Sequence, residues 1–240
     1  MTGIAAILMA VTVVASSSTG LPDETAPASL SYGDRGPWVA ELNEELAESG
    51  FHPNSGSFFG RKTRHAVYAF QKHHGFPTTG RFTAFMWDLL DGPPRLPERK
   101  EADRIEVDLS KQVLYVVKNQ QVALVVPISS GNERRYVTES GGTARATTPE
   151  GTFRFQRRIR GMREAFLGKM WNPYYFWRGF AIHGSPSVPN HPASHGCIRV
   201  TMWDMDLLVS HFEIGQRVYI YGKRTAPPPP FVPEEPPVVF

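Results

Sequence analysis

Residues 104–126 read RIEVDLSKQVLYVVKNQQVALVV, and their pattern indicates the architecture of the larger part of the chain. Apolar residues recur at every second position, which predicts strands that each bury one face. Three strands follow, containing 105–109, 113–117 and 122–126, with tight turns at Ser110-Lys111 and Asn119-Gln120. Further strand-like runs cover 151–160, 179–183 and 216–221, and one helix is expected over 202–211. The pattern predicts a mainly antiparallel β-sandwich or barrel-like domain over residues 104–223.

The segment before this domain has a helical period instead. Val39, Leu42 and Leu46 form one amphipathic stripe, and Ala66, Val67 and Phe70 form a second on a helix over 63–74. A third short helix is expected over 82–90, so residues 31–91 are predicted to form a small three-helix bundle. Three prolines and alternating charges mark 92–103 as a linker. The chain is therefore expected to be an α+β protein of two domains.

Both ends of the chain differ in composition from its middle. Residues 4–15 are a continuous apolar run of 12 residues, too short to span a bilayer but typical of a secretory signal. Val13-Val14-Ala15 would form the cleavage site, and a Ser/Thr/Pro-rich linker would complete residues 1–30. The alternative is a frayed apolar terminus of a cytosolic protein. Seven prolines between 224 and 240 predict an extended tail.

Composition excludes several classes of protein. With 41% hydrophobic and 20% charged residues, the 240-residue chain can pack a core. A net charge of +3 is too small for a dedicated nucleic-acid binder, so no nucleic-acid partner is expected. One cysteine, Cys197, rules out a disulfide framework and any zinc site built from several cysteines.

Cys197 stands in a setting that suggests nucleophilic chemistry. A thiol becomes a strong nucleophile beside an imidazole, and His183 and His195 are both close in sequence. Gly196 would let substrate approach and backbone N–H groups reach an oxyanion, while Arg199 could hold a substrate carboxylate. The alternatives are a small buried cysteine and a metal site, although the spacing matches no standard zinc pattern.

Residues 194–199, SHGCIR, resemble the Ser/Thr-His-Gly-Cys-x-Asn/Arg signature of L,D-transpeptidases, the YkuD family. His183 matches the upstream catalytic histidine of that family, and residues 148–153, TPEGTF, are similar to its Thr-Pro-x-Gly-x-Phe segment. The strand at 107–115 and the run at 126–131 resemble the opening hairpin of the same domain. The resemblance covers about residues 104–222.

The helical segment has a resemblance of its own. Residues 33–36 (GDRG), the apolar stripes, Phe59-Gly60 and Trp87 occur in the order seen in type 1 peptidoglycan-binding domains. Such a domain binds the polymer on which an L,D-transpeptidase acts, so the two resemblances agree.

Together with the apolar run at residues 4–15, the resemblances imply an exported enzyme without cofactor or metal. Cys197 would be acylated by a stem tetrapeptide with loss of D-Ala, His183 would move the proton, and the Gly184 carbonyl would orient the imidazole. Backbone N–H groups around His195, Gly196 and Cys197 would form the oxyanion hole. Arg199 and Ser194 would bind substrate. Attack by an amine of a second stem would then give a 3→3 cross-link.

Two other functions stay open at this point. The acyl-enzyme could be given to water, which would make the protein an L,D-carboxypeptidase or peptide hydrolase. Alternatively, the protein could be a non-catalytic cell-wall-binding protein. The expected partners are peptidoglycan stem peptides and glycan, and an integral membrane protein is not expected.

Overall fold

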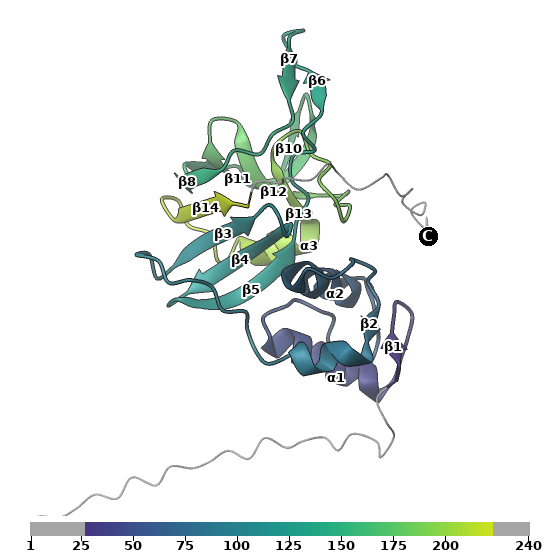
Figure 1. Cartoon of the computed structure of the whole chain (residues 1–240). Helices are drawn as coiled ribbons and strands as arrows, with labels where there is room; N and C mark the ends of the chain where they lie inside the picture. Colours follow the sequence, from purple (N-terminus) through teal and green to yellow (C-terminus); the bar gives the residue numbers. More distant parts are fainter. Residues whose placement is uncertain (1–26, 223–240) are drawn as a thin grey trace, which may run out of the picture.

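The computed structural model describes residues 27–222, which form a helical part at one end and two β-sheets at the other (Figure 1). The predicted signal segment and the Pro-rich tail lie outside the described residues. No helix within 27–222 is both long enough and apolar enough to cross a membrane.

The helical part contains two α-helices, a 3-10 helix and a two-stranded ribbon. These elements are β1 (Ser29–Leu30), α1 (Pro37–Glu48), α2 (Arg61–His74), β2 (Phe82–Thr83) and η1 (Ala84–Leu89). Proline starts α1, where its missing N–H costs nothing, and Gly75 ends α2 in the left-handed conformation with φ of 75°. The predicted three-helix bundle is corrected accordingly, because the third helix is a single 3-10 element that follows the β2 strand.

The first sheet is built on the alternating stretch at residues 104–126. It has the strand order β5-β4-β3-β14-β8. The strands are β3 (Arg104–Asp108), β4 (Val113–Lys118), β5 (Gln121–Pro127), β8 (Gly151–Arg154) and β14 (Arg217–Tyr221). Asn119 and Gln120 turn the chain between β4 and β5 with φ of 50° and 67°, as a two-residue hairpin requires. The pairing of β3 with β14 is parallel and the other pairings are antiparallel.

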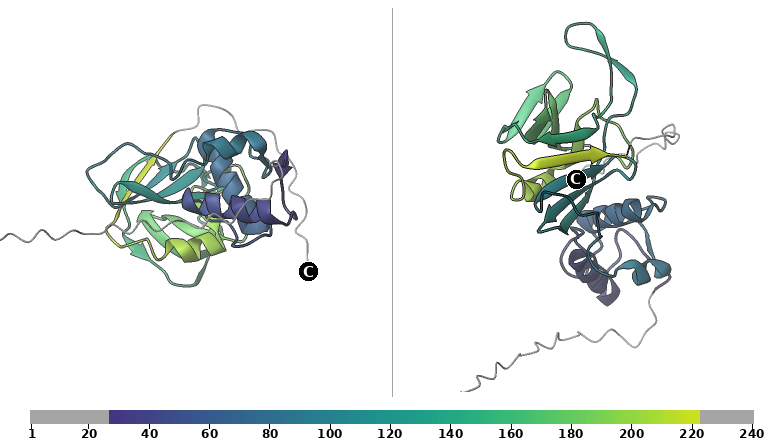
Figure 2. Two further views of the ribbon diagram at one scale, coloured as in Figure 1. Left: turned by 90° about the horizontal axis from the view of Figure 1, so that it is seen from below. Right: turned by 60° about the vertical axis from the view of Figure 1, so that its left-hand side comes forward.

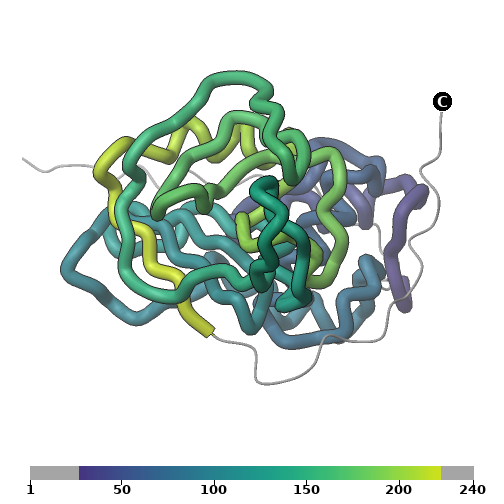
Figure 3. The backbone as a smooth tube through the Cα atoms, turned by 90° about the horizontal axis from the view of Figure 1, so that it is seen from above, coloured from purple at the N-terminus to yellow at the C-terminus, as the bar shows by residue number. Residues whose placement is uncertain are grey.

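The second sheet carries the cysteine motif. Its order is β10-β11-β12-β13, with β9 also paired to β11. The strands are β9 (Arg157–Arg158), β10 (Met162–Ala165), β11 (Gly168–Trp177), β12 (Phe180–Ser185) and β13 (Ile198–Thr201), and α3 (Met202–Leu208) follows directly. A separate hairpin of β6 (Arg135–Val137) and β7 (Thr143–Arg145) projects from this end of the molecule (Figures 1 and 3). The sheets enclose one core between them as a mixed sandwich, and neither closes into a barrel within the described chain.

Strand β4 is buried on both faces, which the simple alternation did not predict. Leu114 and Val116 pack into the core between the two sheets. Val113, Tyr115 and Val117 point the other way, into a core that the sheet shares with α1, α2 and η1. Figure 2 shows the helical part on this side of the first sheet, with α2 lying against β4 and β5. The molecule therefore has three layers, with the first sheet in the middle.

The helical part is also tied to the sheet through the backbone. The N–H of Val125 donates to the carbonyl of Gly50 at 2.8 Å, and Phe51 forms a parallel bridge with Val125. On α2, Nδ1 of His73 lies 2.9 Å from the hydroxyl of Tyr115. These bonds fix the helical part against β4 and β5.

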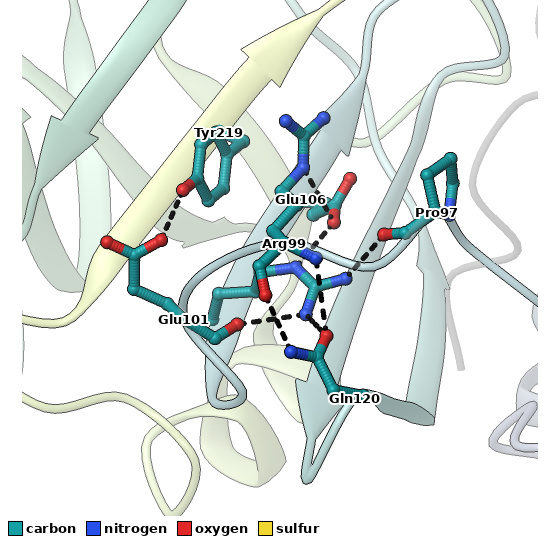
Figure 4. A network of polar contacts seen from close by, with 7 residues as sticks. Pro97, Arg99, Glu101, Glu106, Gln120 and Tyr219 are labelled. Atoms are coloured by element: carbon teal, nitrogen blue, oxygen red, sulfur yellow. Dashed lines mark hydrogen bonds and ion pairs between the residues drawn. The ribbon is translucent and has the colours of Figure 1, made fainter.

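The segment predicted as a linker is fastened to the first sheet by a buried arginine (Figure 4). Arg104 is fully buried and donates to the carbonyl of Pro97 at 3.0 Å and to Gln120 Oε1 at 2.6 Å. Its Nε lies 2.6 Å from Glu106 Oε1, which also accepts from Arg99 Nε at 3.1 Å. Arg104 and Glu106 alternate with Ile105, which packs in the core between the two sheets. Their side chains therefore lie on the other face of the first sheet, and residues 97–101 cover them there.

Candidate active site

The parallel pairing of β12 with β13 brings the predicted catalytic residues together. Ile182 and Ile198 are partners in register, and both are fully buried in the core between the sheets. Side chains alternate along a strand, so His183 and its register partner Arg199 project from the opposite face. Cys197 directly precedes β13, close enough to Arg199 for that charge to act on its thiol. The register thus places His183 and Arg199 side by side, with Cys197 at the start of the second strand.

His183 is held as a neutral imidazole. Its Nδ1 lies 2.9 Å from the carbonyl oxygen of Gly184, and because a carbonyl can only accept, Nδ1 carries the proton. Burial lowers the pKa of His183 to about 4, with the nearby charge of Arg199 acting in the same direction. The Nε2 lone pair is consequently available to accept a proton at neutral pH.

Cys197 is partly buried beside the turn that joins β11 to β12. Its Sγ lies 3.9 Å from the carbonyl oxygen of Gly179. Burial raises the pKa of the Cys197 thiol, while a hydrogen bond from the backbone of Ala181 and the charge of Arg199 oppose that shift. In this structure the site therefore holds a neutral thiol and a neutral imidazole rather than a preformed ion pair.

Ser194 holds the loop that precedes the cysteine. Its side chain is buried, with its Oγ donating to the carbonyl of Cys197 at 2.5 Å and accepting from the N–H of Gly196 at 3.0 Å. Thr148, also buried, donates its hydroxyl to the carbonyl of Gly196 at 2.8 Å. The Gly196 N–H, expected from the sequence to serve an oxyanion hole, is already engaged with Ser194.

Glycine is required at position 196 by its surroundings. Gly196 has φ of 125°, a conformation that residues with side chains rarely adopt. A Cβ atom there would lie 2.5 Å from Cε1 of Phe180 and 2.9 Å from the carbonyl oxygen of Thr147. The close approach of Phe180 therefore depends on the missing side chain.

Gly184 has a packing role in addition to its carbonyl. A Cβ at this position would lie 3.0 Å from Cβ of Met205 on α3 and 3.0 Å from Cβ of Trp171 on β11. The missing side chain allows α3 and β11 to close around the strand that carries His183.

His195 points toward the β6–β7 hairpin. Its ring lies 4.8 Å from that of Tyr136 in an edge-on contact, and its buried Nδ1 has no hydrogen-bond partner among residues 27–222. Burial lowers the pKa of His195, again with a contribution from Arg199. His195 thus lines the side of the site formed by the hairpin.

Arg199 offers an unneutralised charge to this surface. Its side chain is partly buried, forms no ion pair with any acid that the structure describes, and has a pKa lowered by burial. A half-buried guanidinium without a carboxylate partner is well suited to bind an anionic group.

Residues 128–132 support the site, and the sequence alone did not reveal their role. The backbone of Ser129 makes two hydrogen bonds with that of Arg199, at 2.9 and 3.0 Å. The carbonyl of Ser130 accepts from the N–H groups of Ala193 and Ser194 at 3.0 and 2.9 Å. At Gly131 a Cβ would lie 2.1 Å from the carbonyl oxygen of Ala146, so this position also requires glycine. Ser-Ser-Gly directly after an apolar strand was the available signal for such a segment.

Comparison with known proteins agrees with this geometry. The family model of the L,D-transpeptidase catalytic domain, YkuD, matches residues 102–220, and that of a peptidoglycan-binding domain matches residues 35–90. A search of curated proteins found no match.

One solved structure spans both the helical part and the catalytic domain. The crystal structure of an L,D-transpeptidase from Xylanimonas cellulosilytica is 38% identical, covers 83% of this chain and 100% of its own, and superposes with a TM-score of 0.76. An L,D-transpeptidase from Stackebrandtia nassauensis is 19% identical over 84% of this chain and 99% of its own, with a TM-score of 0.48. The chain belongs to the L,D-transpeptidase family, with a YkuD catalytic domain that follows a peptidoglycan-binding domain.

Proposed function

We propose that this protein is an exported cysteine L,D-transpeptidase that cross-links peptidoglycan 3→3 through an acyl-enzyme on Cys197. The observation that carries the proposal is the pairing of β12 with β13, which sets the neutral imidazole of His183 beside the unpaired guanidinium of Arg199, with Cys197 directly before β13. Family membership supports the substrate class, and the apolar run at residues 4–15 supports export.

The acylation step uses His183 as the base. Nε2 accepts the thiol proton of Cys197 as the sulfur attacks the carbonyl carbon of the third stem residue. The tetrahedral intermediate collapses to a thioester, and the amine of D-Ala leaves with the proton returned by His183. Since both groups begin neutral, the proton moves during the attack and not before substrate binds.

The charge that develops on the substrate oxygen needs donors close to the sulfur. The N–H of Gly196 is bonded to Ser194, so we assign the oxyanion to the backbone N–H groups of His195 and Cys197. Arg199 would hold a carboxylate of the stem peptide. Ser194 and Thr148 act on the shape of the loop and need no contact with substrate.

The second half-reaction regenerates the thiol. The side-chain amine of another stem attacks the thioester carbonyl, His183 takes a proton from the amine and returns it to the sulfur, and a cross-linked dimer leaves. Attack by water in place of the amine would release a tripeptide instead.

Mass spectrometry of both protein and products tests the proposal. The purified protein is incubated with a disaccharide-tetrapeptide beside Cys197→Ser and His183→Gln variants. We expect an adduct on Cys197 with the mass of the disaccharide-tripeptide less one water, release of D-Ala and a 3→3 dimer, all absent from the serine variant. An adduct followed only by tripeptide would assign the protein to hydrolysis, and wall binding without any adduct would overturn catalysis altogether.

Export is tested separately in cells. A fusion of the whole chain to a reporter that is active only outside the cytoplasm should give signal, and deletion of residues 4–15 should abolish it. Equal signal from both fusions would contradict export by this segment.

A further inference from the structure

A lysine of the helical part reaches a buried backbone carbonyl of the catalytic domain. Lys72 lies on α2, is only 6% exposed, and donates from Nζ to the carbonyl oxygen of Ile128 at 3.0 Å. Ile128 is itself fully buried. No acidic side chain within residues 27–222 pairs with Lys72.

Burial of an amine without a counter-ion opposes stability. An apolar side chain of similar length would fill the same space without that desolvation cost. Burial lowers the pKa of Lys72 to about 7, and both the ammonium and the neutral amine carry N–H groups that can donate. The hydrogen bond to Ile128 is therefore the one contribution of this side chain that an apolar residue could not supply.

The carbonyl that Lys72 holds belongs to the segment that supports the active site. Ser129, the next residue, makes both backbone hydrogen bonds with Arg199. One residue further on, the carbonyl of Ser130 holds the N–H groups of Ala193 and Ser194. Cys197 lies between these two points of attachment, so a displacement of Ile128 would be transmitted to both sides of the nucleophile.

We propose that Lys72 of the peptidoglycan-binding domain is a positioning residue for the catalytic loop, and that it acts by fixing the carbonyl of Ile128. The helical part then completes the active site in addition to binding the cell wall. This inference goes beyond the proposed function and rests on it only for the kinetic readout below.

The neighbouring residue on α2 supplies a matched control. His73 also crosses the interface, but its Nδ1 bonds the hydroxyl of Tyr115 in the middle of β4. Neither His73 nor Tyr115 contacts residues 128–132 through a hydrogen bond in the part of the chain described. Removing either hydrogen bond weakens the same interface, whereas only the bond of Lys72 reaches residues 128–132, which hold the catalytic loop.

The test compares Lys72→Met and His73→Phe in the full chain. Hydrogen exchange is measured at the amides of Ser129 and Arg199, which form the paired bonds. We expect Lys72→Met to speed exchange at both amides by about tenfold and His73→Phe to leave them unchanged. Acylation by the stem tetrapeptide should fall about tenfold in kcat with little change in KM for Lys72→Met alone, because the loop would be displaced without loss of substrate contacts.

Urea unfolding separates this role from a purely structural one. Lys72→Met removes a buried amine, so its free energy of unfolding should not fall in proportion to the loss of activity. Unchanged exchange at both amides in Lys72→Met, or equal effects of the two variants, would overturn the inference. If Lys72→Met does not fold, Lys72→Leu, which likewise lacks a donor, is judged by the same criteria.

The exchange measurement needs no substrate. If the wild-type protein forms no acyl-enzyme while Lys72→Met still loosens the two amides, the proposed function fails and the positioning role stands. If acylation proceeds and the amides do not respond, the positioning role alone fails.

Discussion

Removing the helical part should unfold the catalytic domain. The first sheet contributes five buried side chains to the core that it shares with the helices, namely Val113, Tyr115, Val117, Val122 and Val125. The perturbation is to express residues 92–240 alone. All five side chains would then meet water on one face of β4 and β5.

The expected cost is comparable with the whole stability of a domain. Burial of one such side chain stabilises a fold by about 1.5–3 kcal/mol, so exposure of five costs on the order of 8–15 kcal/mol. Folded domains have a total free energy of unfolding of about 5–15 kcal/mol. We therefore expect residues 92–240 to be unfolded or aggregated, although the catalytic motifs are all present.

Circular dichroism in urea compares residues 92–240 with residues 27–240. Two substitutions in the longer protein provide an internal control, because neighbouring residues on β5 face different cores. Val125 is 1% exposed and packs against the helical part, whereas Val126 is fully buried between the sheets. Val125→Ala and Val126→Ala should each lower the free energy of unfolding by about 1–3 kcal/mol.

A stable, monomeric 92–240 segment that unfolds at the same urea concentration as the longer protein would refute this reasoning. So would a Val125→Ala variant of unchanged stability beside a destabilised Val126→Ala. Either result would mean that the helical part rests on the sheet without sharing a core.

Three further predictions concern the active site. Gly196→Ala should lower the free energy of unfolding by about 1–3 kcal/mol and nearly abolish acylation, since its Cβ would overlap Phe180. The control is Gly179→Ala, whose Cβ would have no atom within 4 Å and which should have little effect on stability. Equal urea midpoints for the two variants would contradict the argument. Burial lowers the pKa of His183 to about 4, so the neutral base is lost only as pH falls through that value. The acylation rate constant, measured by rapid quench, should therefore stay level between about pH 5 and 8. A steep rise between pH 6 and 7 would show that His183 titrates normally. Arg199→Gln should lower kcat/KM for the tetrapeptide by about 10- to 100-fold but have little effect on a tetrapeptide with a C-terminal amide; an equal loss on both substrates would argue against carboxylate binding.

Local patterns in the sequence predicted most single elements. The period of two located β3, β4 and β5, and the left-handed turn at Asn119 and Gln120 fell at the expected place. The amphipathic stripes located α1 and α2, with Gly75 as the stop. These features are governed by neighbours within a few residues, so the sequence alone carries them.

Elements that depend on distant partners were missed or altered. The β6–β7 hairpin is mostly exposed and polar, so it has no strong period. The third helix shortened to a 3-10 element, and β4 proved to be buried on both sides. For β4 the deciding contacts come from the helices, which lie far away in sequence.

The candidate catalytic residues could be picked out from the sequence alone, because a single cysteine preceded by His-Gly, with a second His-Gly pair upstream, leaves few candidates. Their surroundings depend on packing between distant segments. The parallel register of β12 and β13 places His183 beside Arg199, with Cys197 directly before β13, and burial favours the neutral forms of both His183 and Cys197. The link from Lys72 to Ile128 spans 56 positions in the sequence, and no local pattern encodes it. Protonation states depend on how far water is excluded from a group, and long-range hydrogen bonds depend on which segments lie side by side. Both conditions arise only when the layers of the fold pack together.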